Sequence, residues 1–229
     1  MSKELGALNF PGFVDAIDVS QVQQFGDVNL IAQSGFKAAF VKVAESVGAV
    51  DPRGKDTLNR LRDAGLYVGV YSFARVEHGG AERHAQHLYD SYGETFVSRM
   101  FLDLERAPAN YSAAQLCDFA EQFFEKTDSF GGMPALFYSY PNFIASRMMP
   151  ELKTRSSLLS RPLWIAQYAS LTKPWAPRQS ELDFPDKRPW KQWEAWQYSG
   201  NCGYRVPGVL NDCDRNLIRT DDIKSWFGY

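Results

Sequence analysis

The stretch from Met100 to Glu105, MFLDLE, places two acids one residue apart at the end of an apolar run. Carboxylates are rarely found where a chain is ready to be buried. In a β-strand, residues two apart share one face, so Asp103 and Glu105 point one way and Leu102 and Leu104 the other. The alternation therefore predicts a strand with one face in the core and an acidic end on its other face.

Strand-like and helix-like segments alternate on both sides of this stretch. Beta-branched or apolar runs at 14–20, 36–46, 66–74, 96–105 and 134–140 are separated by helical patterns at 27–35, 51–65, 81–92 and 112–128, and a short helix follows residue 141. Such alternation is typical of an α/β protein with a parallel sheet. After residue 150 the runs LWIAQYA, EAWQYS and 211–218 read as strands between Pro-rich loops without helical periodicity. Eight strands over this length predict one closed or nearly closed barrel.

The composition is that of an ordinary globular chain. It has 229 residues, 45% of them hydrophobic and 23% charged, and no linker divides it, so we expect one domain over 1–229. The net charge is -2 without a basic block, so no nucleic-acid partner is expected. There is no apolar stretch of roughly 20 residues and no signal-peptide pattern at the N-terminus. We expect a soluble, monomeric protein that needs no membrane.

Acids also close other predicted strands. Asp18 ends the first strand, and Asp214 lies on the last, with Asp212 two residues earlier as an alternative. First and last strands become neighbours when a barrel closes, and barrel enzymes keep their chemistry at the C-terminal ends of the strands. A single strand-end Asp is usually a turn residue, but the joint placement of these acids with Asp103 and Glu105 predicts one acidic cleft.

Aromatic residues collect at the same strand ends. Their flat apolar faces with a polar handle suit sugar rings as well as core packing. Together with a neighbouring amide, they give the predicted substrate-binding residues Tyr71, Tyr138, Tyr140, Gln167, Tyr168, Trp196 and Tyr198. By contrast, core packing is the better interpretation of Phe73 and Trp164.

Other motifs exclude several chemistries. His84 and His87 are three residues apart, which suits a solvated helix face better than a metal site. No nucleophile elbow, phosphate loop or dinucleotide fingerprint is present, and neither a metal nor a cofactor is expected. Three cysteines do not make a disulfide framework, although Cys202 and Cys213 could pair.

Seven short motifs, in order, resemble the glycoside hydrolase family 25 lysozymes, the Chalaropsis-type N-acetylmuramidases common in phage endolysins. They are AIDVSQVQ at 16–23, AAFVKVAES at 38–46, GVYSFA at 69–74, FLDLE at 101–105, LWIAQY at 163–168, AWQYS at 195–199 and CDRN at 213–216. Ser72 stands where the family usually has His, CDRN replaces its usual VDLN, and the Pro- and Trp-rich insertion between Tyr168 and Trp196 is long. We expect that insertion to shape the cleft.

The resemblance implies a flattened TIM-like barrel of five β/α units followed by three β-strands. It also implies hydrolysis of the β-1,4 bond between N-acetylmuramic acid and N-acetylglucosamine in bacterial peptidoglycan, without a cofactor. Such hydrolysis needs a proton donor and a negative charge near the reacting carbon. We assign Glu105 as the general acid, and Asp18, Asp103 and Asp214 are the candidates for the charges that raise its pKa. The resemblance favours Asp18 or Asp103 as the group that stabilises positive charge or orients the substrate's acetamide.

Two other functions are compatible with the same residues. The four acids could form a divalent-metal site, because hard cations take oxygen ligands. The barrel could also be an inactive glycan-binding module, although the presence of both Asp103 and Glu105 argues against it. For the hydrolase we expect a protein made without a signal peptide that acts on the bacterial wall, either as a phage lysin released from its host or after export by another route.

Overall fold

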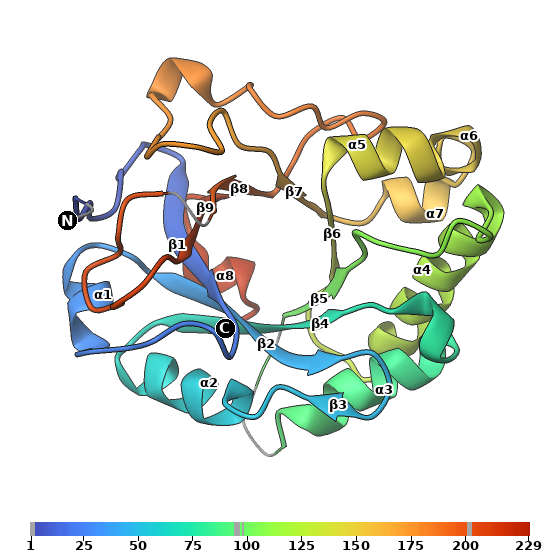
Figure 1. The fold of residues 1–229 in the computed structure, drawn as a ribbon, viewed down its shortest axis with the longest axis horizontal. Helices are drawn as coiled ribbons and strands as arrows, with labels where there is room; N and C mark the ends of the chain where they lie inside the picture. The colour runs from blue at the N-terminus through green and yellow to red at the C-terminus, as the bar shows by residue number, and fades with distance from the viewer. Residues whose placement is uncertain (1–2, 94–96, 98, 201–202) are drawn as a thin grey trace.

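The strands of the computed structural model, which describes residues 3–93, 97, 99–200 and 203–229, close into a barrel. Strand β1 pairs with both β2 and β9, so the sheet returns on itself, as Figure 1 shows. The closed α/β barrel expected from the sequence is therefore confirmed. The barrel strands are β1 (Phe13–Val19), β2 (Ala38–Glu45), β4 (Tyr67–Phe73), β5 (Met100–Asp103), β6 (Leu136–Ser139), β7 (Leu163–Ala166), β8 (Ala195–Ser199) and β9 (Asp214–Arg219).

The direction of the strands brings their carboxyl ends to one rim. Pairing is parallel from β1 through β2 and onward to β8. Strand β9 is antiparallel to both of its neighbours, so its first residue, Asp214, lies opposite Asp18 near the end of β1. A short strand, β3 (Ala49–Val50), extends β2 as an antiparallel hairpin that the sequence pattern did not indicate.

Helices surround the barrel on the outside (Figure 1). They are α1 (Asn29–Gln33), α2 (Gly54–Asp63), α3 (Ala81–Ser91), α4 (Ala113–Asp128), α5 (Pro141–Phe143), the π-helical η2 (Ile144–Met148), α6 (Met149–Leu152) and α7 (Ser156–Leu159), with the 3-10 turns η1 (Val76–His78) and η3 (Gln179–Glu181). Helix α4 begins where expected, because Ser112 accepts from the backbone N–H of Gln115 in a capping box.

Some short helices escaped the sequence analysis. Helix α7 and the last helix, α8 (Ile223–Trp226), lie in the region where no helix was expected. Each has four residues, about one turn, which is too short for a 3.6-residue period to show. Helix α1 is also shorter than its pattern of 27–35, because it begins at Asn29 and ends at Gln33.

Strand β5 divides the core into two layers, as its alternation predicted. Met100, Leu102 and Leu104 are buried in the layer between the sheet and the helices, whereas Phe101 is buried inside the barrel. Glycine is needed at position 69 of β4, because a Cβ there would lie 2.5 Å from Cε2 of the Phe101 ring. The close approach of this ring is thus built into the neighbouring strand.

Aromatic rings fill the barrel below the rim. Phe40, Phe101 and Trp164 contact one another with ring centroids 4.5 to 5.4 Å apart, and Trp226 of α8 packs on Phe40. The guanidinium group of Arg99 lies against the Trp226 ring, and its Nε donates to the backbone carbonyl of Trp226. The N-terminal end of the barrel is therefore closed by packing, which leaves the opposite end for polar groups.

Within the described residues, no helix has the length and apolar character needed to cross a membrane.

Candidate active site

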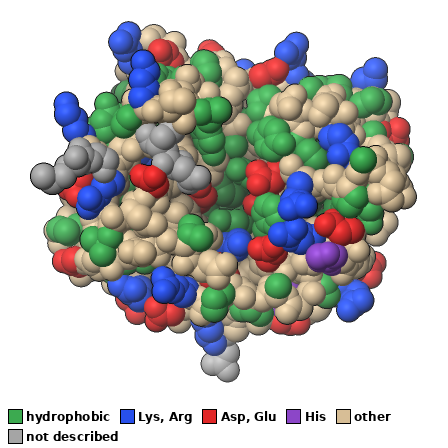
Figure 2. Space-filling model, in the orientation of Figure 1, with side chains coloured by type: hydrophobic (Ala, Val, Ile, Leu, Met, Phe, Trp, Pro, Cys, Tyr) green, Lys and Arg blue, Asp and Glu red, His purple; other side chains and the backbone are tan. Residues whose placement is uncertain are grey.

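A cleft of about 170 Å³ opens at the C-terminal ends of the strands. The space-filling view shows this hollow near the centre of the face, with acidic and basic side chains around it (Figure 2). Every barrel strand, or the residues just after it, contributes to the cleft. Its lining consists of Asp18, Ser20, Lys42, Tyr71, Phe73, Asp103, Glu105, Tyr138, Trp164, Gln197 and Asp214.

The four predicted catalytic acids meet in this cleft. Asp18 comes from β1, Asp103 from β5, Glu105 from the residues just after β5, and Asp214 from β9. Because strands far apart in the sequence close one barrel, acids separated by up to 196 positions in the chain share one small volume. Their juxtaposition is the arrangement that the strand-end pattern predicted.

Asp18 is held by two carboxamides. Its Oδ2 accepts from Nε2 of Gln197 at 2.8 Å and from Nδ2 of Asn216 at 2.7 Å. Burial raises the pKa of Asp18 to about 6, while these hydrogen bonds act in the opposite direction. Asp18 is 4% exposed, so almost all of its solvation comes from the protein.

Asp214, and not Asp212, is the acid of the last strand that belongs to the site. Asp214 begins β9, lines the cleft and hydrogen-bonds to the carboxyl group of Asp18. Two carboxyl groups can share a hydrogen bond only if one holds a proton, and burial followed by the charge of Asp18 raises the pKa of Asp214 well above its usual value. Asp212 is exposed, and its carbonyl accepts from Nε2 of Gln23.

Asp103 is about as deeply buried as Asp18 but lacks the amide partners that Asp18 has. It is 6% exposed, and its Oδ1 has no hydrogen-bond partner among the described residues. Burial, followed by the charges of Glu105 and Asp18, raises its pKa well above the usual value, and Lys42 opposes this. A carboxyl group in such a place favours its neutral, protonated form.

Glu105 is half-buried at the mouth of the cleft. Burial is the main cause of its raised pKa, the charge of Asp18 adds to it, and Arg106 opposes it. A raised pKa is what a carboxyl group needs to hold a proton near neutral pH and donate it during a reaction. Of the four acids, Glu105 therefore combines access to the cleft with a tendency to stay protonated.

A second pocket of about 390 Å³ adjoins the first and shares Glu105 and Tyr138 with it. It is lined further by Tyr140, Pro141, Asn142, Ala166, Gln167, Tyr168 and Leu171. Five of the predicted substrate-binding residues, namely Tyr71, Tyr138, Tyr140, Gln167 and Tyr168, thus line one pocket or the other. Glu105 lies between the two pockets, where a bond spanning them would pass.

Trp196 and Tyr198 do not line either pocket, which corrects their predicted placement. Both are at most 1% exposed and belong to the outer core layer. The alternation of β8 has the opposite phase: Gln197 points into the barrel, while Trp196 packs under Trp175 and Phe184 of the insertion. A fully buried ring cannot contact a substrate in the cleft.

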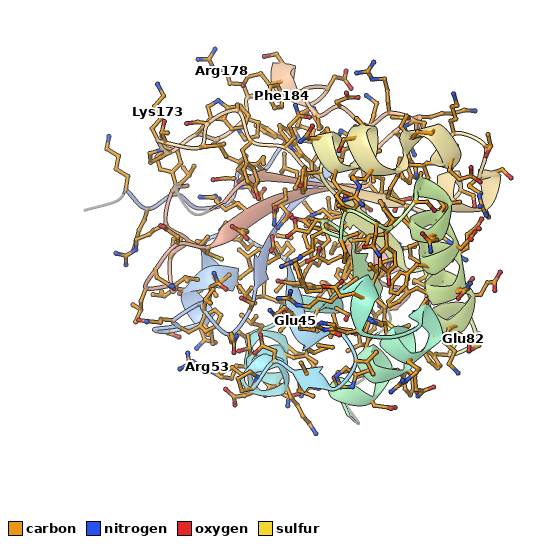
Figure 3. All side chains as sticks on the ribbon, turned by 45° about the vertical axis from the view of Figure 1, so that its right-hand side comes forward. Glu45, Arg53, Glu82, Lys173, Arg178 and Phe184 are labelled. Atoms are coloured by element: carbon orange, nitrogen blue, oxygen red, sulfur yellow. The ribbon has the colours of Figure 1, made fainter. Side chains whose placement is uncertain are left out.

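The insertion between β7 and β8 contributes less to the cleft than expected. Leu171 reaches the second pocket, whereas Phe184 packs against Trp196. Figure 3 shows Lys173, Arg178 and Phe184 along this segment at the top of the view. Trp175, Phe184 and Trp193 of the insertion thus cover Trp196 on the outer face of β8.

A small ion cluster lies beside the cleft. Glu45 at the end of β2, labelled in Figure 3, pairs with Nζ of Lys42 at 3.2 Å and with Nε of Arg75 at 2.6 Å. These cations lower the pKa of Glu45. Lys42 also lines the cleft, so one positive charge is held near Asp103 by a fixed partner.

Gln197 and Asn216 are the polar groups whose role the sequence analysis missed. Each lies within a motif that it singled out, AWQYS and CDRN, but neither was assigned a role in the cleft. For Asn216 the available signal was the period of two, because it lies two residues after Asp214, whereas Gln197 lies on a strand that is buried on both faces.

The structure also changes the interpretation of His84 and Ser72. His84 is fully buried rather than on a solvated face, because its ring packs edge-on against Phe119 of α4. Ser72 is buried on the face of β4 away from the cleft, since its neighbours Tyr71 and Phe73 line the cleft.

The possible pairing of Cys202 with Cys213 cannot be described, because Cys202 lies outside the described residues. Among those residues, no group of three His, Cys, Asp or Glu side chains is arranged to hold a metal ion.

A closed α/β barrel with a carboxyl cluster at the C-terminal ends of its strands defines a class: barrel enzymes that work by acid–base chemistry. The family can be stated as well. The chain belongs to glycosyl hydrolases family 25, whose model matches residues 17–209.

Relatives of known name support the assignment. The chain is similar to an autolytic lysozyme of Clostridium acetobutylicum, 25% identical over 162 residues, and to a lysozyme of Streptococcus phage Cp-9, 26% identical over 210 residues. These matches cover 69% and 90% of this chain. The chain spans 46% and 54% of those relatives' own lengths.

Solved structures share the fold. A bacterial lysozyme from Streptomyces coelicolor matches with a TM-score of 0.74 at 21% identity, covering 93% of this chain and 94% of that one. A family GH25 lysozyme from Aspergillus fumigatus matches with a TM-score of 0.71 at 18% identity, covering 93% and 97%. At these identities the likeness establishes the barrel and not the substrate.

Proposed function

We propose that this protein is a lysozyme, an N-acetylmuramidase that hydrolyses the β-1,4 bond between N-acetylmuramic acid and N-acetylglucosamine in bacterial peptidoglycan. The observation that carries the proposal is the position of Glu105, a half-buried acid with a raised pKa between two pockets lined by tyrosines. Tyrosine rings suit the faces of sugars, and an acid at their junction suits a glycosidic oxygen. The names of the relatives, lysozymes of a bacterium and of a phage, support the same substrate.

In the proposed reaction Glu105 donates its proton to the glycosidic oxygen. The bond from the muramic acid carbon to that oxygen then breaks, and N-acetylglucosamine leaves with a new hydroxyl group. Positive charge develops at the carbon, where a carboxylate or the substrate's own acetamide carbonyl can stabilise or attack it. Asp18 and Asp103 are the candidates for the carboxylate role. Glu105, now ionised, takes a proton from water as water completes the hydrolysis.

Asp18 prepares Glu105 for this step. The charge of Asp18 contributes to the raised pKa of Glu105, so the donor keeps its proton until the substrate arrives. No step needs a cofactor. We also propose that the chain acts as a single monomeric catalytic domain on the bacterial wall, independently of nucleic acid and membrane, because the acid cleft lies within one barrel.

The substitution Glu105→Gln tests the assignment of the proton donor. We expect clearing of a cell-wall suspension to slow by about 100-fold to 10,000-fold, the usual contribution of general acid catalysis. The circular dichroism spectrum and the melting temperature should show a folded protein. A matched control, Glu82→Gln, changes an exposed glutamate of α3 and should leave the rate unaltered.

Two outcomes would contradict this proposal. Full activity of the Glu105→Gln protein would exclude Glu105 as the donor. Loss of wild-type activity on chelation with EDTA would favour a divalent-metal site instead, and an absence of wall clearing by the wild-type protein would favour a binding module.

A further inference from the structure

Two carboxamide side chains converge on a single oxygen of Asp18. Gln197 comes from β8 and Asn216 from β9, and both are at most 2% exposed. Their amide nitrogens lie 2.8 and 2.7 Å from Oδ2 of Asp18. Both amide contacts end on one oxygen of Asp18, so their effect falls on that carboxyl group.

The orientation of Asn216 is fixed by a donor that cannot act as an acceptor. Nε1 of Trp164 lies 2.8 Å from Oδ1 of Asn216. An indole N–H only donates, so the amide atom that faces it must be the oxygen. The NH₂ group of Asn216 is therefore turned toward Asp18, whose oxygen has to accept.

The oxygen of Gln197 accepts from two hydroxyl groups. The hydroxyl of Tyr138 donates to Oε1 of Gln197 at 3.0 Å, and the hydroxyl of Tyr168 donates to the same oxygen. With its oxygen occupied, Gln197 presents Nε2 to Asp18. Three aromatic side chains thus turn two amides so that both direct N–H groups at one carboxylate oxygen.

This arrangement stabilises the ionised form of Asp18. An oxygen that already accepts two N–H groups is a poor place for a proton, and hydrogen bonds to the charged form of a carboxyl group favour that form. Asp214 adds a carboxyl hydrogen bond to Asp18. Asp103, in the same cleft, has a buried oxygen without any partner among the described residues.

We propose that Gln197 and Asn216 are positioning residues that keep Asp18 as the fixed negative charge of the cleft. Trp164, Tyr138 and Tyr168 act one step further out, by orienting the two amides. The inference rests on the proposed function, in which a negative charge stabilises the positive charge that develops on the sugar and keeps Glu105 protonated. It assigns that charge to Asp18 rather than to Asp103.

The substitution Gln197→Met removes one donor with little change in side-chain volume. We expect the titration midpoint of Asp18, followed by the ¹³Cγ resonance in NMR and assigned by comparison with Asp18→Asn, to rise by about one pH unit or more. The hydroxyls of Tyr138 and Tyr168 line the pockets, where water can replace their lost acceptor. An unchanged midpoint would overturn the proposal.

The same variant makes a prediction for the enzyme. The acidic limb of the pH profile of kcat should move upward with the midpoint of Asp18, while KM changes little. A kcat that falls equally at every pH, with the limb unmoved, would show a merely structural role for Gln197 and overturn the proposal. Wild-type protein that shows the NMR behaviour but does not cut peptidoglycan would contradict the proposed function alone.

A second variant covers the case in which Gln197→Met does not fold. The double substitution Tyr138→Phe with Tyr168→Phe keeps Gln197 but removes both hydroxyls that orient its amide. The Asp18 midpoint should rise, by less than in Gln197→Met. Tyr89→Phe, at an exposed tyrosine of α3, is the matched control and should leave the midpoint unaltered. No rise in the double variant would contradict the role assigned to the amide.

Discussion

Asp18 and Asp103 lie in one cleft but differ in what surrounds them. Asp18 receives two amide hydrogen bonds, whereas Oδ1 of Asp103 has no partner among the described residues. A buried carboxyl group without a partner is costly when it ionises. The cleft therefore holds one acid whose charge is supported and one whose charge is opposed, although the two side chains are almost equally buried.

Asp103→Asn should stabilise the protein at neutral pH. The pKa of Asp103 is raised in the folded state. Ionisation of Asp103 therefore costs stability progressively as the pH rises above the pKa of the unfolded chain, which is about 3.9. Asparagine removes that cost. We expect the melting temperature to rise by at least about 2 °C near pH 7. The gain should disappear at about pH 3.5, where Asp103 is protonated in both the folded and the unfolded protein.

An exposed aspartate provides the control for this measurement. Asp63→Asn, at the end of α2, should leave the melting temperature unaltered at both pH values. An Asp103→Asn protein that is less stable than the wild type near pH 7 would show that the ionised carboxylate of Asp103 is supported rather than opposed.

The period of two was enough to predict part of the site. It placed Asp103 and Glu105 on the inner face of β5 because the alternate residues were leucines. In β8 the choice was between Trp196 with Tyr198 and Ala195 with Gln197, and both faces are buried. Hydrophobicity cannot set the phase of a strand that is buried on both sides, so the inward position of Gln197 could not be predicted.

At the scale of elements, α3 and α4 pack together around a buried histidine. The ring of His84 lies edge-on to Phe119, and neither ring nitrogen has a hydrogen-bond partner among the described residues. Burial lowers the pKa of His84 to about 4. The imidazole is thus neutral in the folded protein over most of the pH range.

His84→Leu should change how stability depends on pH. Folding lowers the pKa of His84, so the neutral imidazole contributes fully to stability above the pKa of the unfolded chain, which is about 6.5. That contribution is lost as the pH falls from there through the folded pKa of about 4. Leucine cannot take up a proton. The stability of the variant relative to wild type should therefore rise as the pH falls from about 7.5, above the unfolded pKa, to about 4.5, just above the folded pKa.

Comparing the two pH values for each protein removes the constant effect of repacking. Denaturant unfolding supplies the free energies, and His87→Leu, at a half-buried position on the same helix, is the matched control. Parallel pH dependence in the wild-type and His84→Leu proteins would mean that this histidine does not resist protonation.

The long elements were predictable and the short ones were not. Helix α4 has an N-cap at Ser112 and repeating apolar residues over four turns, which specify it locally. Helices α7 and α8 have one turn each and depend on packing against the barrel. His84 was misplaced for a related reason: a polar residue on a helix predicts exposure unless the neighbouring helix is already known.

At the scale of the whole molecule, barrel closure connects the parts. It brings Asp214 opposite Asp18 and gathers acids from β1, β5 and β9, while the aromatic core and Trp226 close the other end. The alternation of strands and helices was sufficient to predict this architecture, since every long strand was visible in the sequence. The acid cleft and the second pocket adjoin at this rim, with Glu105 and Tyr138 common to both.

The most direct test of the proposed function is the identity of the ends that the protein creates. Purified peptidoglycan is digested with the wild-type protein, reduced with borohydride and analysed by mass spectrometry, with the Glu105→Gln protein as control. We predict fragments that end in reduced N-acetylmuramic acid, and none above background with the variant. Fragments that end in reduced N-acetylglucosamine, or no new reducing ends, would contradict the assignment as a muramidase.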